Sequence, residues 1–421
     1  MSLHRVLSLG LAFMMCLVST VNNVVFPPAP ITGALVPIAT TDDMKYVPAV
    51  AYDSLHDQFL AVWEHALPGT GIHEIDGELI SATGTLLQNF VVSSDIHDEL
   101  TPDVAFDSVN SRFLVVWAYD VRGDQSDFDI YYRLIPSTGP DTGNQEMPID
   151  LGIQPSVQPK VAFELYSNAF LIIWKNNFYN TTEASISGAQ RKNDGSFVPF
   201  TVYSDDFHKG IDAPAIAYDA ASNNLLAVWD EKREFTGWDI VGQRLGPAGQ
   251  ALGNLIDMTN STGDDFHPTV TACPMQDMYL VENEYTFSSS TQGLGARAIY
   301  GDGSEVIGFA GGNVKPSFWP KVGCAPGGNR FQVAWAEAPL DSGQLQILVN
   351  AVEISPGLGI SGYPARVDVA DGSGDRVYPA IASGKSSSLV VWEQVRDQGG
   401  YTDIYGRIIY PYRFFLPVLR K

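Results

Sequence analysis

A segment of about 55 residues recurs seven times in this chain, and this repeat limits the possible folds more than any other feature. Each copy begins with a proline and continues into two apolar runs, as in PAVAYDSLHDQFLAVWEH after residue 47. The copies begin at Pro48, Pro102, Pro159, Pro214, Pro268, Pro320 and Pro379. Self-similarity at a fixed period is typical of propellers, solenoids and other arrays. We therefore expect one repetitive domain instead of several unrelated ones.

The copies contain up to four strand-like runs each. The second run is continuously apolar, as in Phe113–Trp117, and the third begins at Asp129, Asp239 and Asp403 in three of the copies. A continuous apolar run is expected where a strand is covered on both faces, as in blades that stack around an axis. Four strands per unit predict an all-β, seven-bladed β-propeller with four-stranded antiparallel blades.

The last copy lacks a fourth strand, because the chain nearly ends after its third strand-like run at Asp403–Ile409. The stretch Gly33–Thr40 precedes the first copy and matches a fourth strand in sequence. We expect this N-terminal strand to complete the last blade, because closure of the ring removes an exposed sheet edge.

Composition and charge exclude two classes of protein. Hydrophobic residues make up 45% of the chain and charged residues 17%, which excludes a disordered protein. The formal net charge of −23 would repel phosphate backbones, so we expect no nucleic-acid partner.

Both ends of the chain carry features of an exported protein. His4 and Arg5 precede an apolar run from Val6 to Val21, which suits a signal peptide over residues 1–21 better than a membrane span. The propeller is then expected over residues 34–410, followed by a tail at 411–421. The mature chain would have no membrane span and would be secreted or lie at the cell surface.

The consensus runs VAYD, FLVVWE and DIYGQRL resemble repeats in large secreted bacterial β-propeller proteins, over residues 34 to about 410. This resemblance implies the architecture and carries no known reaction. The repeats lack the Gly-His and Trp-Asp pairs of WD40 blades. The tail from Tyr412 to Arg420 resembles surface-sorting tails of green filamentous bacteria and implies attachment at the cell surface; a last strand on the rim is the alternative.

Residues that recur in most copies are interpreted as packing and turn residues. A tryptophan ends the apolar run in six copies, at positions 63, 117, 174, 229, 335 and 392, and Asn283 replaces it in the fifth. Equivalent blades need equivalent core side chains. Asp53, Asp107 and Asp219 end the first strand, where aspartate accepts backbone hydrogen bonds in tight turns.

Acidic residues and histidines gather in the loops that enter the first strand of each copy and at the ends of the second strands. Loops on one face of a propeller differ between blades while the scaffold does not, so this acidic face is the candidate ligand-binding surface. Its residues are Asp95, His97, Asp98, Asp205, Asp206, His208, Asp264, Asp265, His267, Glu64, Asp230 and Glu393.

Three interpretations of this face remain open. Its carboxylates would suit Ca²⁺, which prefers oxygen ligands. A carboxylate pair could act as acid and base in glycoside cleavage. The acids could also only cap turns and keep the face soluble. A transition-metal site at His97, His208 and His267 is a weaker option because their spacings are long.

The absence of a catalytic motif favours an extracytoplasmic binding or scaffold propeller over an enzyme. Its partner would be a protein, a glycan or a cation held on the acidic face. The alternative is a carbohydrate-active enzyme, a glycoside hydrolase or lyase, that uses carboxylates of the same face.

Two cysteines remain after removal of the predicted signal, Cys273 and Cys324. They lie near the ends of first strands in neighbouring copies, where the Tyr-Asp of the repeat is lost. A disulfide between the two blades is predicted, provided that the Cα atoms lie within about 7 Å.

Overall fold

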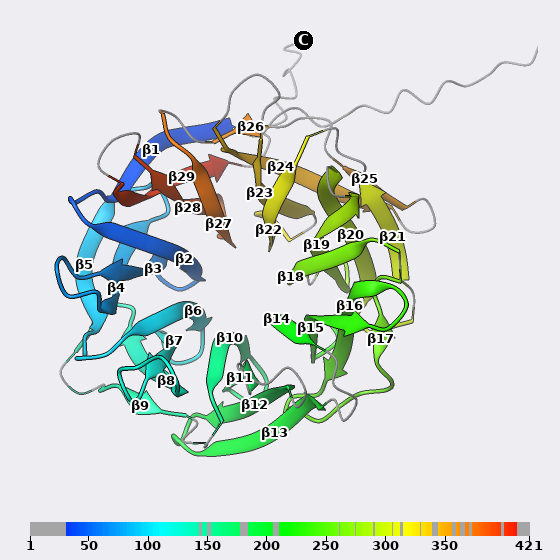
Figure 1. Ribbon diagram of the computed structural model, residues 1–421, viewed down its shortest axis with the longest axis horizontal. Helices are drawn as coiled ribbons and strands as arrows, with labels where there is room; N and C mark the ends of the chain where they lie inside the picture. Colours follow the sequence, from blue (N-terminus) through cyan, green and yellow to red (C-terminus); the bar gives the residue numbers. More distant parts are fainter. Residues whose placement is uncertain are drawn as a thin grey trace, which may run out of the picture.

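The computed structural model describes 31–141, 143, 145–149, 152, 154–176, 184–204, 210–260, 262–273, 275–288, 291–304, 306–311, 315–328, 330–338, 344–355, 359–362, 367–369, 373–396 and 400–410. These residues form seven antiparallel sheets arranged as a ring (Figure 1). They contain no helix, and therefore none that could cross a membrane. The predicted seven-bladed β-propeller is confirmed. The predicted signal peptide and tail lie outside the described residues.

Each blade places its first strand against the axis and its second strand behind it (Figure 1). The innermost strands are β2 (Met44–Asp53), β6 (Glu99–Asp107), β10 (Ser156–Glu164), β14 (Ile211–Asp219), β18 (Asp264–Cys273), β22 (Ser317–Cys324) and β27 (Arg376–Ser383). The second strands are β3 (Gln58–Ala66), β7 (Arg112–Asp120), β11 (Ala169–Asn176), β15 (Asn224–Arg233), β19 (Met278–Ser288), β23 (Phe331–Glu337) and β28 (Ser388–Val395).

The third and fourth strands lead to the rim. The third strands are β4 (His73–Ser81), β8 (Phe128–Pro136), β12 (Ser185–Lys192), β16 (Gly237–Leu245), β20 (Thr291–Tyr300), β24 (Gln346–Ser355) and β29 (Thr402–Tyr410). The outer strands are β5 (Leu86–Ser93), β9 (Met147–Pro148), β13 (Phe197–Ser204), β17 (Ile256–Asp257), β21 (Val306–Gly311) and β25 (Gly359–Gly362), with β26 (Val367–Asp368) also on β24. Two outer strands are only two residues long, so the predicted fourth runs are shortened there.

The ring closes through the N-terminal strand. Strand β1 (Ile31–Ala39) pairs antiparallel with β29, and Val36 lies opposite Gly406. The seventh blade thus has the order β1-β29-β28-β27, with the first strand of the chain at its rim (Figure 1). This confirms the closure predicted from the incomplete last repeat.

The core lies between the faces of neighbouring blades, where the second strands are buried on both sides. Trp117, Trp229, Trp335 and Trp392 are completely buried, and the predicted packing role of the repeated tryptophan is confirmed. The Asn283 side chain in the fifth blade donates a hydrogen bond to Asp265 Oδ1 at 2.6 Å. This bond satisfies the amide that replaces an indole ring in the core.

The strand-ending aspartates cap the turns between the first and second strands, as predicted. Asp107 Oδ1 accepts hydrogen bonds from the backbone N–H groups of Val109 and Asn110, at 3.0 and 2.8 Å. Two blades replace this acid with Cys273 and Cys324, which form a disulfide with a Cα–Cα distance of 5.3 Å. The disulfide joins the innermost strands of the fifth and sixth blades.

Candidate functional site

Every innermost strand carries a bulge just before the proline of its repeat. The residue before the proline has a positive φ, between 45° and 56°, in all seven blades. These pre-proline residues are Val47, Thr101, Gln158, Ala213, His267, Trp319 and Tyr378. The left-handed conformation is costly for residues with a Cβ atom, and strain of this kind gathers at functional sites. Here it recurs in every blade, so it belongs first to the scaffold.

Carboxylates at the ends of second strands hold these bulges from the preceding blade. Glu64 Oε1 accepts a hydrogen bond from the backbone N–H of Thr101 at 2.6 Å, and Asp230 Oδ2 accepts one from His267 at 3.1 Å. Glu284 and Glu393 bind the next bulges in the same way, at 2.9 and 3.4 Å. We call Glu64, Asp230, Glu284 and Glu393 the inter-blade carboxylates. Three of them were predicted as ligand-binding residues, and each has a structural bond.

Two inter-blade carboxylates lie in surroundings that favour the protonated acid. Burial and the charge of Asp212 raise the pKa of Asp230 to about 7, and its Oδ1 atom has no hydrogen bond among the described residues. Burial, with a smaller effect from Glu64, raises the pKa of Glu393 to about 7. The pKa of both groups therefore lies near neutral pH.

The innermost strands surround an axial cavity of about 450 Å³. Its lining consists of the pre-proline residues, the prolines and the next few residues of each innermost strand. The prolines and several alanines recur between blades, so the pre-proline residue gives the mouth its chemical variety. Blades five, six and seven place His267, Trp319 and Tyr378 there in succession.

His267 and the two aromatic residues form a connected group at the mouth of the cavity. Glu284 Oε1 lies 3.1 Å from His267 Nδ1 and also accepts the N–H of Trp319. The rings of Trp319 and Tyr378 have centroids 4.5 Å apart, and Tyr378 is 39% exposed. The His267 side chain is 55% exposed. The bond to Glu284 raises the pKa of His267 and fixes its ring, leaving Nε2 available.

A second aromatic group lies on the first blade near the same mouth. The rings of Tyr46 and His73 are stacked with centroids 5.7 Å apart, and His73 Nδ1 lies 3.3 Å from Glu64 Oε2. This bond raises the pKa of His73. The imidazole, tyrosine and carboxylate combination therefore occurs twice around the axis.

The predicted loop acids have separate partners. Asp98 accepts hydrogen bonds from the His73 backbone and the Gln125 side chain, both at 3.0 Å, and Asp95 Oδ1 accepts the N–H of Ile96. His97 packs on the ring of Tyr119, with centroids 6.0 Å apart. These contacts fix the loops around the first and second blades.

The corresponding acids of the fifth blade also bind the scaffold. Asp264 Oδ1 accepts the backbone N–H of Trp238 at 3.0 Å, and Asp265 binds Asn283 as described above. Asp205, Asp206 and His208 lie outside the described residues. Of the predicted histidines, the structure places His267 at the cavity mouth.

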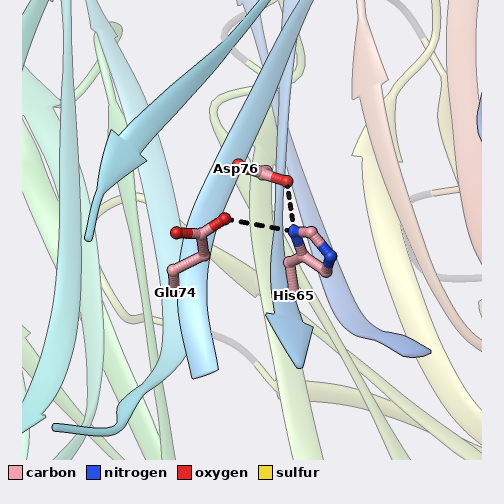
Figure 2. Close-up of side chains that lie close together, drawn as sticks. All are labelled: His65, Glu74 and Asp76. Carbon is pink, nitrogen blue, oxygen red and sulfur yellow. Dashed lines mark ion pairs between the residues drawn. The ribbon is translucent and has the colours of Figure 1, made fainter. Parts of the chain in front are cut away.

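A cluster that the sequence did not reveal lies on the first blade (Figure 2). His65 Nδ1 lies 2.8 Å from Asp76 Oδ2 and 3.2 Å from Glu74 Oε1, while its Nε2 lies 2.9 Å from Asp43 Oδ2. The ligand atoms of His65, Glu74 and Asp76 all lie within 4.8 Å of one another, which is close enough to hold a metal ion.

Electrostatics favour an ion-pair network in this cluster. Hydrogen bonding to Asp76 and further contacts with Asp43 raise the pKa of His65 to about 9, so its ring is an imidazolium at neutral pH. Lys45 pairs with Asp43 and adds a second positive charge. A metal ion at His65 would first have to displace the Nδ1 proton, because only the neutral ring nitrogen is a ligand. The carboxylate oxygens alone would suit a hard cation such as Ca²⁺.

Several of these residues could have been found by comparing the seven copies position by position. The position before the proline holds a histidine, a tryptophan and a tyrosine in three copies and smaller residues in the other four. The cluster at His65 has a weaker signal, because Glu74 and Asp76 come from a different strand of the same blade.

Comparisons with known proteins show the fold. A scan against protein-family models and a search of curated proteins both find no match. Among solved structures, the polysaccharide lyase Uly1 has a TM-score of 0.59 at 9% identity, covering 90% of this chain and 99% of that chain. A puromycin hydrolase S511A mutant has a TM-score of 0.52 at 10% identity, covering 85% of this chain and 53% of that chain.

Proposed function

We propose that this protein is a carbohydrate-active enzyme that cleaves a polysaccharide at the mouth of the axial cavity. The observation that carries this proposal is the group formed by His267, Glu284, Trp319 and Tyr378 on the rim of a 450 Å³ cavity. Partly exposed aromatic rings give a sugar an apolar surface to stack on. A histidine oriented by a carboxylate gives the same site a group that can move a proton.

The roles follow from the contacts of each residue. Glu284 holds the Nδ1 side of His267, so Nε2 is the atom that would exchange a proton with a bound glycan. Trp319 and Tyr378 would bind a sugar ring beside it. Glu393, with a pKa of about 7, would be a second proton donor of suitable strength.

The similarity to a polysaccharide lyase supports this proposal over the binding scaffold favoured by the sequence alone. It covers nearly the whole of both chains, although the identity of 9% shows only a shared fold. The binding interpretation is the second candidate, because the inter-blade carboxylates already have structural bonds. A binding protein would use the same aromatic surface without turnover.

We also propose that the protein acts outside the cytoplasm. The disulfide between Cys273 and Cys324 supports this location, since such bonds persist in oxidising compartments. A soluble or surface-attached glycan would then be the partner.

The test is a polysaccharide panel assayed for new reducing ends and for the ultraviolet absorbance of unsaturated sugars. Hydrolysis gives the first signal alone, whereas a lyase gives both. We expect His267→Ala to lower kcat by about 10²- to 10⁴-fold, the usual contribution of general acid–base catalysis. His56→Ala is the matched control, because His56 lies in the turn between β2 and β3. Full activity in His267→Ala contradicts the catalytic assignment, and binding without cleavage favours the second candidate.

A further inference from the structure

The residue that follows each proline extends the lining of the axial cavity below its mouth. In most blades this residue is small: Ala49, Ala215, Thr269 and Ala380 occupy the position in four of the seven. The other three blades carry Asp103, Lys160 and Lys321. Two lysines therefore line one cavity in a chain with 25 basic and 48 acidic residues.

Unlike Lys45 and Lys175, these two lysines have no ion-pair partner among the residues that the structure describes. Lys45 pairs with Asp43, and Lys175 Nζ lies 3.1 Å from Asp212. Lys160 and Lys321 have no hydrogen bond or ion pair from their ammonium groups within the part of the chain that the structure describes. An ammonium group that lines a cavity without an ion-pair partner is costly, so such a group points to an anion that arrives as a ligand.

The two acids whose charges act on Lys321 each accept a backbone hydrogen bond. Asp103 Oδ2 accepts the backbone N–H of Val161 at 2.9 Å, and Glu284 holds His267 and Trp319. Burial lowers the pKa of Lys321 to about 8, and the charge of Lys160 acts in the same direction, whereas Asp103 and Glu284 oppose it. The ammonium group of Lys321 is therefore still largely charged at neutral pH, and the nearby carboxylates offset only part of that charge.

The position of Lys321 connects it to the proposed sugar site. It follows Trp319 by two residues on β22, and both side chains line the same cavity. A ligand that stacks on Trp319 can therefore direct a substituent inward, toward the lysines. Its neutral ring would contact the aromatic residues, and its charge would meet the ammonium groups.

We propose that Lys160 and Lys321 form an anion-binding site that selects acidic sugars, with the carboxylate of a uronic acid as the group bound. This inference rests on the proposed glycan site and specifies its substrate class. A sulfate ester presents similar oxygen acceptors, so the test includes both anions.

The experiment measures equilibrium binding by calorimetry at neutral pH, using three probes of equal length. These are a glucuronate-containing oligosaccharide, the neutral glucose analogue and a sulfated oligosaccharide without uronate. The variants are Lys321→Met, Lys160→Met and the double variant. Lys192→Met is the matched control, because Lys192 is an exposed lysine at the end of β12.

We expect the wild-type protein to bind the uronate probe at least about tenfold more tightly than the neutral probe, the factor expected for a charge-assisted hydrogen bond. Lys321→Met should remove this preference while neutral binding stays within about twofold, and Lys192→Met should keep it. Tighter binding of the sulfated probe, with the same dependence on Lys321, would overturn the assignment to a carboxylate in favour of a sulfate ester.

Failure of the lysine site is distinguishable from failure of the proposed function. Equal binding of all three probes overturns the anion site and leaves the glycan site intact. If none of the three probes binds, but inorganic sulfate binds to the wild type and not to Lys321→Met, the anion site is supported and its role in glycan binding is overturned. Thermal melts check the fold, and Lys321→Met should melt no lower than wild type because it removes an unpaired charge. A lower melting temperature would indicate a structural role instead.

Discussion

Replacing Glu393 by glutamine should change the pH dependence of the free energy of unfolding. The residue is 5% exposed, and the pKa of its carboxyl group is raised from 4.5 to about 7 by burial and by the charge of Glu64. Glutamine keeps an oxygen that can accept the N–H of Val47. It removes only the titrating charge.

The direction of this change in stability follows from proton linkage. Below pH 4.5 the group is protonated in both the folded and unfolded chain and has no effect. Between pH 4.5 and 7 the unfolded chain loses its proton first, so wild-type stability falls by about 1.4 kcal/mol per pH unit. The folded and unfolded pKa values differ by about 2.5, which lowers the free energy of unfolding of the wild type by about 3 kcal/mol. This loss stays constant above pH 7. Glu393→Gln should therefore gain about 3 kcal/mol over wild type between pH 4.5 and 8.

Urea unfolding at pH values from 4 to 9 measures this gain. Glu234→Gln is the matched control, since Glu234 is exposed in the turn between β15 and β16. In a Glu64→Gln background the gain should be smaller, because one of the causes of the raised pKa is gone. A stability difference that is the same at every pH would refute the reasoning.

Three further predictions test the scaffold. Asp107→Ala should destabilise by about 2–4 kcal/mol in urea unfolding, because it leaves two backbone N–H groups without an acceptor, whereas Asp124→Ala in an exposed loop should change stability far less. Trp335→Ala should cost about 3–5 kcal/mol, and a loss below about 1 kcal/mol would contradict its core role. Replacing both Cys273 and Cys324 by alanine should cost about 2–4 kcal/mol and lower the melting temperature; an unchanged melt would show that the disulfide contributes nothing.

Much of the architecture could be predicted because the sequence of one blade recurs seven times in the chain. The repeat spacing, the continuous apolar second strands and the incomplete last copy each depend on local sequence. They therefore predicted the blade number, the strand order and the closure by the N-terminal strand. The repeated tryptophan and the turn aspartates were readable for the same reason, since equivalent blades need equivalent cores and caps.

The candidate site depends on contacts between blades, and for this reason the sequence identified it only in part. The sequence predicted His267 on the ligand-binding face, but it assigned Glu64, Asp230 and Glu393 to a ligand as well. Each of these three carboxylates instead binds the backbone of the next blade. Val47 and Glu393 are 346 residues apart and meet only because the ring closes.

By itself, the sequence determined the number of blades, their strand order and the residues that pack between them, because these features follow from a pattern repeated along the chain. Only the tertiary structure decided which variable residues face one another. The pre-proline residues are far apart in sequence, and the bulges and ring closure bring them around one cavity. The physical reason is that local periodicity sets the shape of a blade, whereas the chemistry at the axis depends on the side chains that different blades place there together.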